Sequence, residues 1–216
     1  MNINEIAKLA GVSRATVSRY LNNGYVSEEK KKIIRKVIEE TGYQPSSQAQ
    51  MLRTKKTKLV GVILPKIDSN TISREVAGIS DILTKKGYQL ILANTNNNIE
   101  EELKYLSLFK DNQVDGVIFI ATILTKQHRD MLKEYKVPIV LLGQRLEGYP
   151  CIFQDDQKAA MTLTEQMVKT GSKFGYITVT DKDEAVGRKR MSGVEEILSK
   201  NKIEFGSEYV KCGDFT

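Results

Sequence analysis

From residue 59 onward the chain alternates short, almost wholly apolar runs with longer amphipathic segments. We predict strands at these runs: LVGVIL (59–64), YQLILAN (88–94), GVIFIA (116–121), PIVLLG (138–143) and FGYITV (174–179). The segments between and after them predict helices near 72–86, 99–110, 125–135, 156–170 and 185–200. Continuously apolar strands are typical of a parallel sheet with helices on both faces. We therefore expect an α/β body.

The last predicted unit of this body is short. After Gly171 the sequence offers one strand, one helix and a further strand near YVKCG (209–213). Two parallel strands and one helix cannot cover both faces of a sheet. We therefore expect the sequence to be a fragment that stops inside a second subdomain.

The first 45 residues show a different pattern, with three short amphipathic helices. Asn2 and Glu5 form a capping pair for a first helix that runs through Ala10. Its inward residues are expected to be Ile6, Leu9 and Ala10. Gly11 then permits the left-handed turn that ends this helix.

Serines open the next two helices. Ser13 is the expected cap of a second helix that runs to about Leu21, with Val17 one turn before Leu21. Ser27 is the expected cap of a third helix, which ends before Gly42. That helix carries the apolar stripe Ile33, Ile34, Val37 and Ile38. Three short helices that share one small apolar centre predict a helix-turn-helix unit.

The net charge of +6 is concentrated in this N-terminal region. Residues 1–58 contain 12 Lys/Arg and 5 Asp/Glu, whereas the other 158 residues contain 21 and 22. A basic segment joined to a nearly neutral one suggests a polyanion-binding head on a separate body. The alternative is a lysine-rich face that is simply solvated.

Other features narrow the class of protein. Cys151 and Cys212 are the only cysteines and have no metal-like spacing, which favours a reducing cytoplasm and predicts neither metal nor cofactor. The opening MNINEIAKLAG does not resemble a secretory signal, and the apolar runs are too short to span a membrane. His128 is the only histidine, and TKQHRDMLKEY around it predicts an exposed helix. We therefore expect that the protein is not an enzyme and that it has no catalytic residues.

The second helix, RATVSRYLNN (14–23), carries a polar face that suits DNA. Arg14 and Ala15 lie in its first turn, and Arg19 follows Ala15 by four residues on the same outward face. Arginine donates two hydrogen bonds to guanine, and a small side chain meets a thymine methyl group. Hydroxyl and amide groups that reach phosphate oxygens flank this face: Thr16, Ser18 and Asn22. A solvent-exposed polar face remains the alternative.

Three consecutive segments carry a specific resemblance. INEIAKLAGVSRATVSRYLNN, VSEEKKKIIRKVIEETGYQP and SSQAQMLRTKKTKLVGVILP resemble the start of the lactose–galactose repressor (LacI/GalR) family almost position by position. The resemblance extends over the whole chain, whose body looks like the family's periplasmic-binding-protein-like effector domain. It implies a dimeric cytoplasmic repressor on a palindromic DNA operator, released by a small effector such as a sugar. The family architecture is longer, with two subdomains that the chain crosses three times.

The resemblance also assigns DNA contacts outside the base-reading residues Arg14, Ala15 and Arg19. It adds Ser13 and Tyr43 to the backbone contacts. A hinge helix then pairs with its dimer mate in the minor groove, where Leu52 pushes between base pairs with Ala49 beside it. Ser46 stands where the family usually has asparagine, and Gln50 stands where arginine is frequent.

Four residues are assigned to the effector by the same resemblance. Ser69 and Thr71 lie in the first effector loop, which lacks the family's Asn-Pro-aromatic-aromatic run. Arg190, three residues before Gly193, matches an effector-binding arginine. Asp155 matches a common aspartate at the crossover, where a structural role stands equally beside ligand contact.

The predicted organisation follows. Residues 1–45 form the helix-turn-helix domain, 46–58 the hinge helix and linker, and 59–216 the effector domain. Within the effector domain the first subdomain covers about 59–155 and the second begins at about 156. A soluble sugar-binding module without a DNA role is the main alternative, against which the basic head and the missing signal peptide argue. A helix-turn-helix fused to a catalytic domain is disfavoured because no catalytic constellation occurs.

Overall fold

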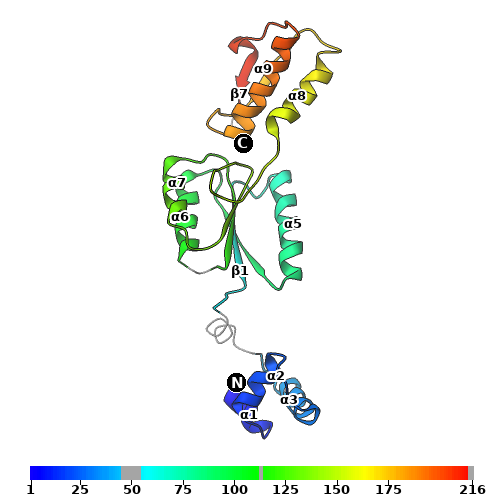
Figure 1. Ribbon diagram of the computed structural model, residues 1–216, viewed down its shortest axis with the longest axis vertical. Helices are drawn as coiled ribbons and strands as arrows, with labels where there is room; N and C mark the ends of the chain where they lie inside the picture. The colour runs from blue at the N-terminus through cyan, green and yellow to red at the C-terminus, as the bar shows by residue number, and fades with distance from the viewer. Residues whose placement is uncertain (45–54, 112–113, 214–216) are drawn as a thin grey trace. The chain divides into compact units, whose positions relative to one another are not determined.

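The computed structural model describes residues 1–44, 55–111 and 114–213. The chain divides into two compact units, residues 1–57 and 58–216. We call them the head and the body, and each is described by itself. Figure 1 shows the helices of the head and the sheet and helices of the body.

The head contains α1 (Ile3–Leu9), α2 (Arg14–Leu21) and α3 (Glu28–Thr41). The predicted capping box at Asn2 is confirmed, because the Asn2 side chain accepts from the Glu5 backbone N–H and the Glu5 carboxylate accepts from the Asn2 backbone N–H. Ser13 caps α2 by accepting from the Thr16 N–H at 3.2 Å. Ser27 occupies the N-cap of α3 without a side-chain cap bond.

One small core joins the three helices. Its buried members are Ile6, Ala7, Ala10, Val17, Val26 and Ile34. Leu9, expected to face inward, is 58% exposed, because Ile6, Ala7 and Ala10 set a buried face roughly 100° around the helix from it. Ile33, expected in the stripe of α3, is also exposed. Gly11 has the left-handed φ of 61° that the turn after α1 requires.

The body begins with a five-stranded parallel sheet. Its strands are β1 (Leu59–Leu64), β2 (Gln89–Asn94), β3 (Gly116–Ile120), β4 (Ile139–Leu142) and β5 (Cys151–Ile152). The order is β2-β1-β3-β4-β5, and every neighbouring pair is parallel. Four strands match the predicted runs, whereas the two-residue β5 was missed because it is too short to give a periodic signal.

Helices cover both faces of this sheet, as Figure 1 shows. The helix α5 (Asn70–Lys85) lies on one face, where Ile72, Val76 and Ile79 pack on Val62, Leu64 and Ile120. On the other face lie α6 (Ile99–Lys110) and α7 (Lys126–Lys133), over a core that includes Ile63, Phe119 and Leu141. Successive β1 residues therefore serve opposite faces, as the continuous apolar run predicts.

A second lobe follows the sheet. It contains α8 (Asp156–Met167), β6 (Tyr176–Thr178), a π-helix η1 (Glu184–Lys189), α9 (Arg190–Lys200), a short 3₁₀ turn η2 (Ser207–Tyr209) and β7 (Val210–Cys212). The strands β6 and β7 pair in parallel, and α8 packs on α9. Gly193 permits this packing, since a Cβ there would collide with the Gln157 carbonyl oxygen. The π-helix was not predicted.

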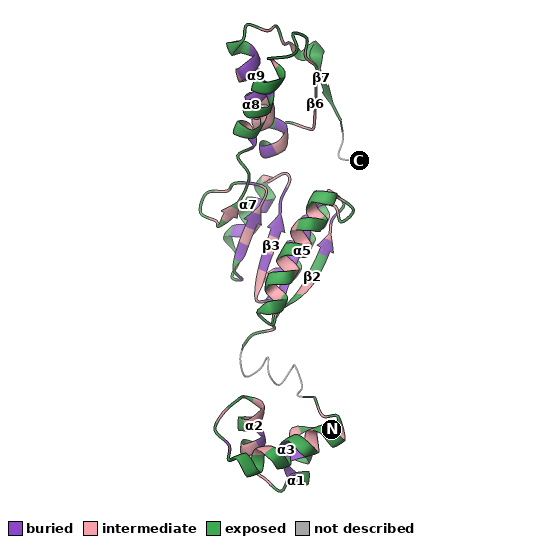
Figure 2. Ribbon diagram, turned by 90° about the vertical axis from the view of Figure 1, so that its right-hand side faces the viewer, coloured by how far each residue is buried: buried purple, intermediate pink, exposed green. Residues whose placement is uncertain are grey.

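These elements confirm the predicted fold class, an all-helical head followed by a parallel α/β body. Figure 2 shows buried residues of the body mainly on the strands of the sheet and on parts of its other helices, whereas α5 carries only intermediate and exposed residues. Among the helices of residues 1–44, 55–111 and 114–213, none has the length and apolar character needed to cross a bilayer.

The prediction for His128 is wrong. Its side chain is fully buried on α7 and stacks on Phe119. Its Nε2 lies 3.1 Å from Oε2 of Glu102 on α6, close enough for an ion pair although the two atoms do not form a hydrogen bond. Thr125 completes the environment, because its hydroxyl lies 2.8 Å from His128 Nδ1. The imidazole therefore packs against the Glu102 carboxylate between α6 and α7 inside the core.

Candidate functional site

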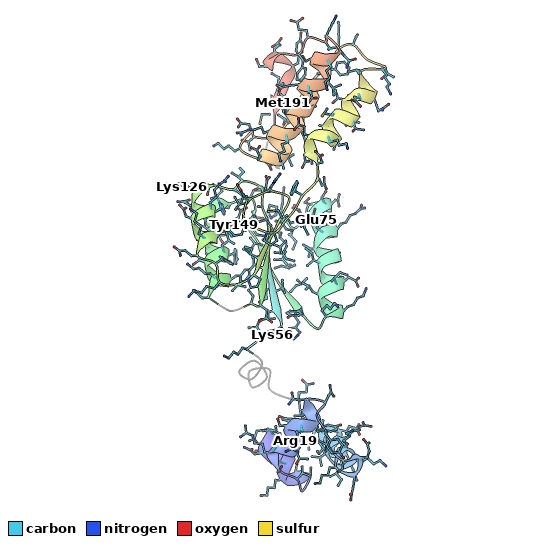
Figure 3. The ribbon with its side chains drawn as sticks, viewed as in Figure 1. Arg19, Lys56, Glu75, Lys126, Tyr149 and Met191 are labelled. Atoms are coloured by element: carbon cyan, nitrogen blue, oxygen red, sulfur yellow. The ribbon has the colours of Figure 1, made fainter. Side chains whose placement is uncertain are left out.

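The first candidate site is the outward face of α2. Arg14, Ala15 and Arg19 are all exposed there, while Val17 on the opposite side is fully buried. Figure 3 labels Arg19 on the head. The helix thus presents two guanidinium groups and a methyl group at its surface, which are groups that read base edges in a major groove.

The polar groups beside this face are already ordered within the head. The Ser13 and Thr16 hydroxyls lie 2.9 Å apart, and Asn22 Nδ2 donates to the Ser18 carbonyl at 2.5 Å. Tyr43 is half-buried and packs against the head core. The first two contacts fix the Ser13, Thr16 and Asn22 side chains at the edge of α2.

The predicted hinge residues Ser46, Ala49, Gln50 and Leu52 lie outside the described residues. Their assignment stays a prediction.

The second candidate site is a cavity of about 540 Å³ in the body. Its walls include residues that directly follow β1, β3, β4 and β6, which is the carboxyl edge where parallel sheets bind ligands. The predicted residues Ser69, Thr71 and Arg190 all line it. The cavity therefore gathers three of the four predicted effector residues.

Arg190, the first residue of α9, is held inside this cavity by a carboxylate. Its Nε lies 2.6 Å from Oδ1 of Asp156, whose side chain is only 6% exposed. Asp155, the predicted residue, does not line the cavity. Its side chain instead caps α8 by accepting from the Lys158 N–H at 3.1 Å. The geometry thus gives Asp155 a structural role, as the cap of α8, and Asp156 is the aspartate that lines the cavity.

A hydrogen-bonded group connects the two lobes at the cavity wall. Gln144, which follows β4, donates through Nε2 to Asp183 Oδ1 at 2.8 Å and to the Thr122 carbonyl at 2.8 Å. The same Asp183 oxygen accepts from the backbone N–H groups of Ala185 and Val186, which begin η1. Three donors therefore converge on one oxygen of Asp183, a residue that is only 2% exposed.

Glu75, on the second turn of α5, also lines the cavity. Its Oε2 is shielded from solvent and has no hydrogen-bond partner among the described residues. Burial raises the pKa of this carboxyl above its ordinary value of 4.5. The cavity thus contains one carboxylate that the described part of the chain leaves unsatisfied.

Sequence reasoning missed Glu75, Gln144, Phe153, Asp156 and Asp183, all of which line the cavity. The position of Gln144 and Phe153 just after β4 and β5 is a usable signal, since ligands gather at strand ends. Phe153 also offers an exposed aromatic face, which the loop at 69–72 lacks. Glu75 gives no signal in the sequence, because its place on α5 resembles that of any helical glutamate.

Comparison with known proteins matches both units. The family described as bacterial regulatory proteins, lacI family, matches residues 2–46. The family described as periplasmic binding proteins and sugar binding domain of LacI family matches residues 57–214. The second match alone covers more than half of the chain.

Individual relatives agree with this assignment. The sucrose operon repressor of Staphylococcus xylosus is 36% identical over 204 residues, which are 94% of this chain and 64% of that protein. Catabolite control protein A of Priestia megaterium is 34% identical over 221 residues and covers 100% of this chain and 66% of its own length. The chain thus spans slightly under two thirds of the length of these relatives.

A solved structure shows the same fold. The lac repressor dimer bound to operator and the anti-inducer ONPF superposes with a TM-score of 0.87 at 21% identity, over 100% of this chain and 66% of that one. With the basic three-helix head, the parallel body and the two family matches in agreement, the chain belongs to the LacI family of bacterial regulatory proteins.

Proposed function

We propose that this protein is a sequence-specific DNA-binding transcriptional repressor whose hold on its operator is controlled by a small sugar or sugar derivative. The observation that carries the proposal is the combination of two sites. The head exposes Arg14, Ala15 and Arg19 on one helix, and the body encloses a cavity at the carboxyl edge of its sheet. A sugar-binding module without a DNA role does not need the first of these sites.

DNA recognition is assigned to α2. Arg14 and Arg19 donate to base edges in the major groove, while Ser13, Thr16, Ser18, Asn22 and Tyr43 contact the phosphate backbone. The hinge residues Ser46, Ala49, Gln50 and Leu52 act in the minor groove, with Leu52 as an apolar wedge. Replacing Leu52 by alanine then reduces operator bending in a gel assay and leaves non-specific binding nearly unchanged.

The protein acts as a homodimer on an inverted repeat. Exposed apolar residues on α5 and on the edge strand β2 support this proposal: Ile82 on the helix, and Ile91 and Leu92 on the strand. Large exposed apolar side chains on neighbouring elements are typical of protein interfaces. A second copy placed on this surface gives two heads, as a two-fold symmetric operator requires.

The effector is assigned to the cavity. The Arg190–Asp156 pair and Gln144 supply donors and acceptors at fixed positions, and Phe153 supplies an aromatic surface for the apolar face of a sugar ring. The similarity to a sucrose operon repressor and to a sugar-binding domain family supports a carbohydrate ligand. The protein works in the cytoplasm, where its DNA lies.

The test is operator selection followed by release. A random-sequence library selected on the protein is expected to yield an inverted repeat bound with strong salt dependence. Adding sucrose, glucose or another sugar from a panel then lowers the affinity. Arg14→Ala and Arg190→Ala separate the two sites, because the first weakens operator binding and the second weakens only the response to sugar. Failure to select any sequence contradicts the DNA role, and turnover of a sugar contradicts the sensor role.

A further inference from the structure

The cavity contains one carboxylate whose chemistry the surrounding chain does not satisfy. Glu75 lines the cavity from the second turn of α5, and Figure 3 labels it on that helix. Its Oε2 is inaccessible to water and has no hydrogen-bond partner in the described structure. A buried acceptor without a donor destabilises the state that contains it.

The other charged groups of the cavity wall have contacts of their own. Arg190 is bonded to Asp156 at 2.6 Å, and Asp183 accepts from Gln144 and from two backbone N–H groups. Lys66 has an interaction of its own. None of these contacts involves Glu75, so a molecule that enters the cavity can supply the donor that its Oε2 lacks.

The chemical class of that molecule follows from the carboxylate. An ionised carboxylate only accepts hydrogen bonds, so a partner must present a hydroxyl, an N–H or an ammonium group. A phosphate or carboxylate placed beside it is repelled, because like charges in a partly desolvated site interact strongly. The cavity wall reinforces this preference, since its three carboxylates, Glu75, Asp156 and Asp183, outnumber the two cations, Lys66 and Arg190.

We propose that Glu75 is a specificity-determining residue of the cavity, which accepts hydrogen bonds from neutral or amino sugars and rejects phosphorylated ones. This inference rests on the proposed function only in taking the cavity as the effector site. Glu75 thereby affects the affinity for ligands in two ways. A ligand hydroxyl that donates to its buried oxygen strengthens binding, and a ligand phosphate placed beside the carboxylate weakens binding. Burial also raises the pKa of this carboxyl, which agrees with the poor solvation of its oxygen.

The experiment measures affinity for four probes by calorimetry: sucrose, glucose, glucosamine and glucose 6-phosphate. The wild-type chain is compared with Glu75→Gln, which keeps the shape and removes the charge, and with Glu165→Gln, an exposed glutamate of α8 outside the cavity. We expect the wild type to bind its preferred uncharged or amino sugar at least tenfold more tightly than glucose 6-phosphate. Glu75→Gln should reduce that ratio about tenfold, and Glu165→Gln should leave it unchanged.

Three results overturn the inference. The first is that Glu75→Gln leaves the ratio of affinities for the preferred sugar and glucose 6-phosphate unchanged. The second is that the wild type binds glucose 6-phosphate more tightly than the other probes; if glucose 6-phosphate also releases the operator, the proposed function stands and only the role of Glu75 is wrong. The third is a lower melting temperature for ligand-free Glu75→Leu than for the wild type, because it would show that the chain itself satisfies the carboxylate. A higher melting temperature supports the inference independently of any probe.

Discussion

The head and the body of this protein handle charge in opposite ways. Within residues 1–44 no charged side chain is buried, although this segment contains the arginines of α2 and the lysines of α3. In the described body Glu102, His128, Asp156 and Asp183 are all at most 5% exposed. The head therefore keeps its charges in water, and the body places some of its charges in the interior with specific partners.

This difference determines what each unit can recognise. Exposed cations attract any polyanion, and salt weakens this attraction by screening it. The charges therefore contribute most of the affinity for DNA, whereas selectivity depends on a few contacts with bases. Buried charges attract little from a distance, but each requires a partner at a fixed position. The head is thus suited to a long DNA surface, and the body is suited to a small ligand with a defined pattern of donors.

The largest expected effect tests the buried charges of the body. Glu102→Leu leaves His128 without its partner in the core, and we expect the free energy of unfolding to fall by about 3 kcal/mol. The double variant Glu102→Leu/His128→Phe should recover most of this loss, because an apolar pair of similar size removes both buried polar groups. Urea unfolding measures all three proteins, with exposed Glu165→Gln as the control. A double variant no more stable than Glu102→Leu contradicts the pairing.

The next effect tests the exposed charges of the head. Arg19→Ala should cost about 1–3 kcal/mol of operator affinity and relax the preference at one base pair in each half-site. Arg19→Lys is the sharper control, since it keeps the charge and loses the two-pronged donor geometry. It should retain the salt dependence and still lose the base preference. Equal weakening on every sequence would show that Arg19 contacts only phosphate.

A smaller effect concerns a neutral group at the edge of the same helix. Thr16→Val removes a hydroxyl that lies 2.9 Å from that of Ser13. We expect a loss of about 1 kcal/mol or less on all DNA sequences, with the slope of affinity against salt unchanged, because no charge is lost. Fluorescence anisotropy at several salt concentrations measures both quantities. A changed preference at a single base pair would move Thr16 into the base-reading set.

The smallest effect is the pH dependence of the cavity carboxylate. The folded-state pKa of Glu75 is raised, so the folded protein binds this proton more tightly than the unfolded chain does. Stability relative to Glu75→Gln should therefore fall as the pH rises from 4.5 through the raised pKa. The other titratable groups of the cavity wall, Lys66, Asp156, Asp183 and Arg190, remain in both proteins. A melting-temperature difference that is flat with pH rules out this titration.

The sequence predicted the architecture well because the signals for it are local. The run at 59–64 and the period of 99–110 each define an element from their own residues. The capping box at Asn2 and Glu5 likewise lies within four residues. Helix faces were less certain, as Leu9 shows, because the choice between adjacent apolar residues depends on where neighbouring helices pack.

The interior polar groups could not be predicted in the same way. TKQHRDMLKEY looks like an exposed helix, but Glu102 from another helix makes a buried position acceptable for His128. Asp155 and Asp156 are equivalent in sequence, and only the start of α8 decides which one caps the helix and which one meets Arg190. The roles of His128 and Asp156 depend on partners far away in the chain, Glu102 and Arg190.

The strand order β2-β1-β3-β4-β5 also has a consequence for how the protein forms during synthesis. The described core of the head is built from residues within its first 44, whereas β1 lies between β2 and β3, and its Val60 pairs with Gly116. A strand made early must therefore wait for one made more than fifty residues later. Local contacts form faster than distant ones. On the ribosome the head can fold first, while β1 remains unpaired on one edge. We therefore expect substitutions in β3 to promote aggregation of nascent chains before they affect the folded protein.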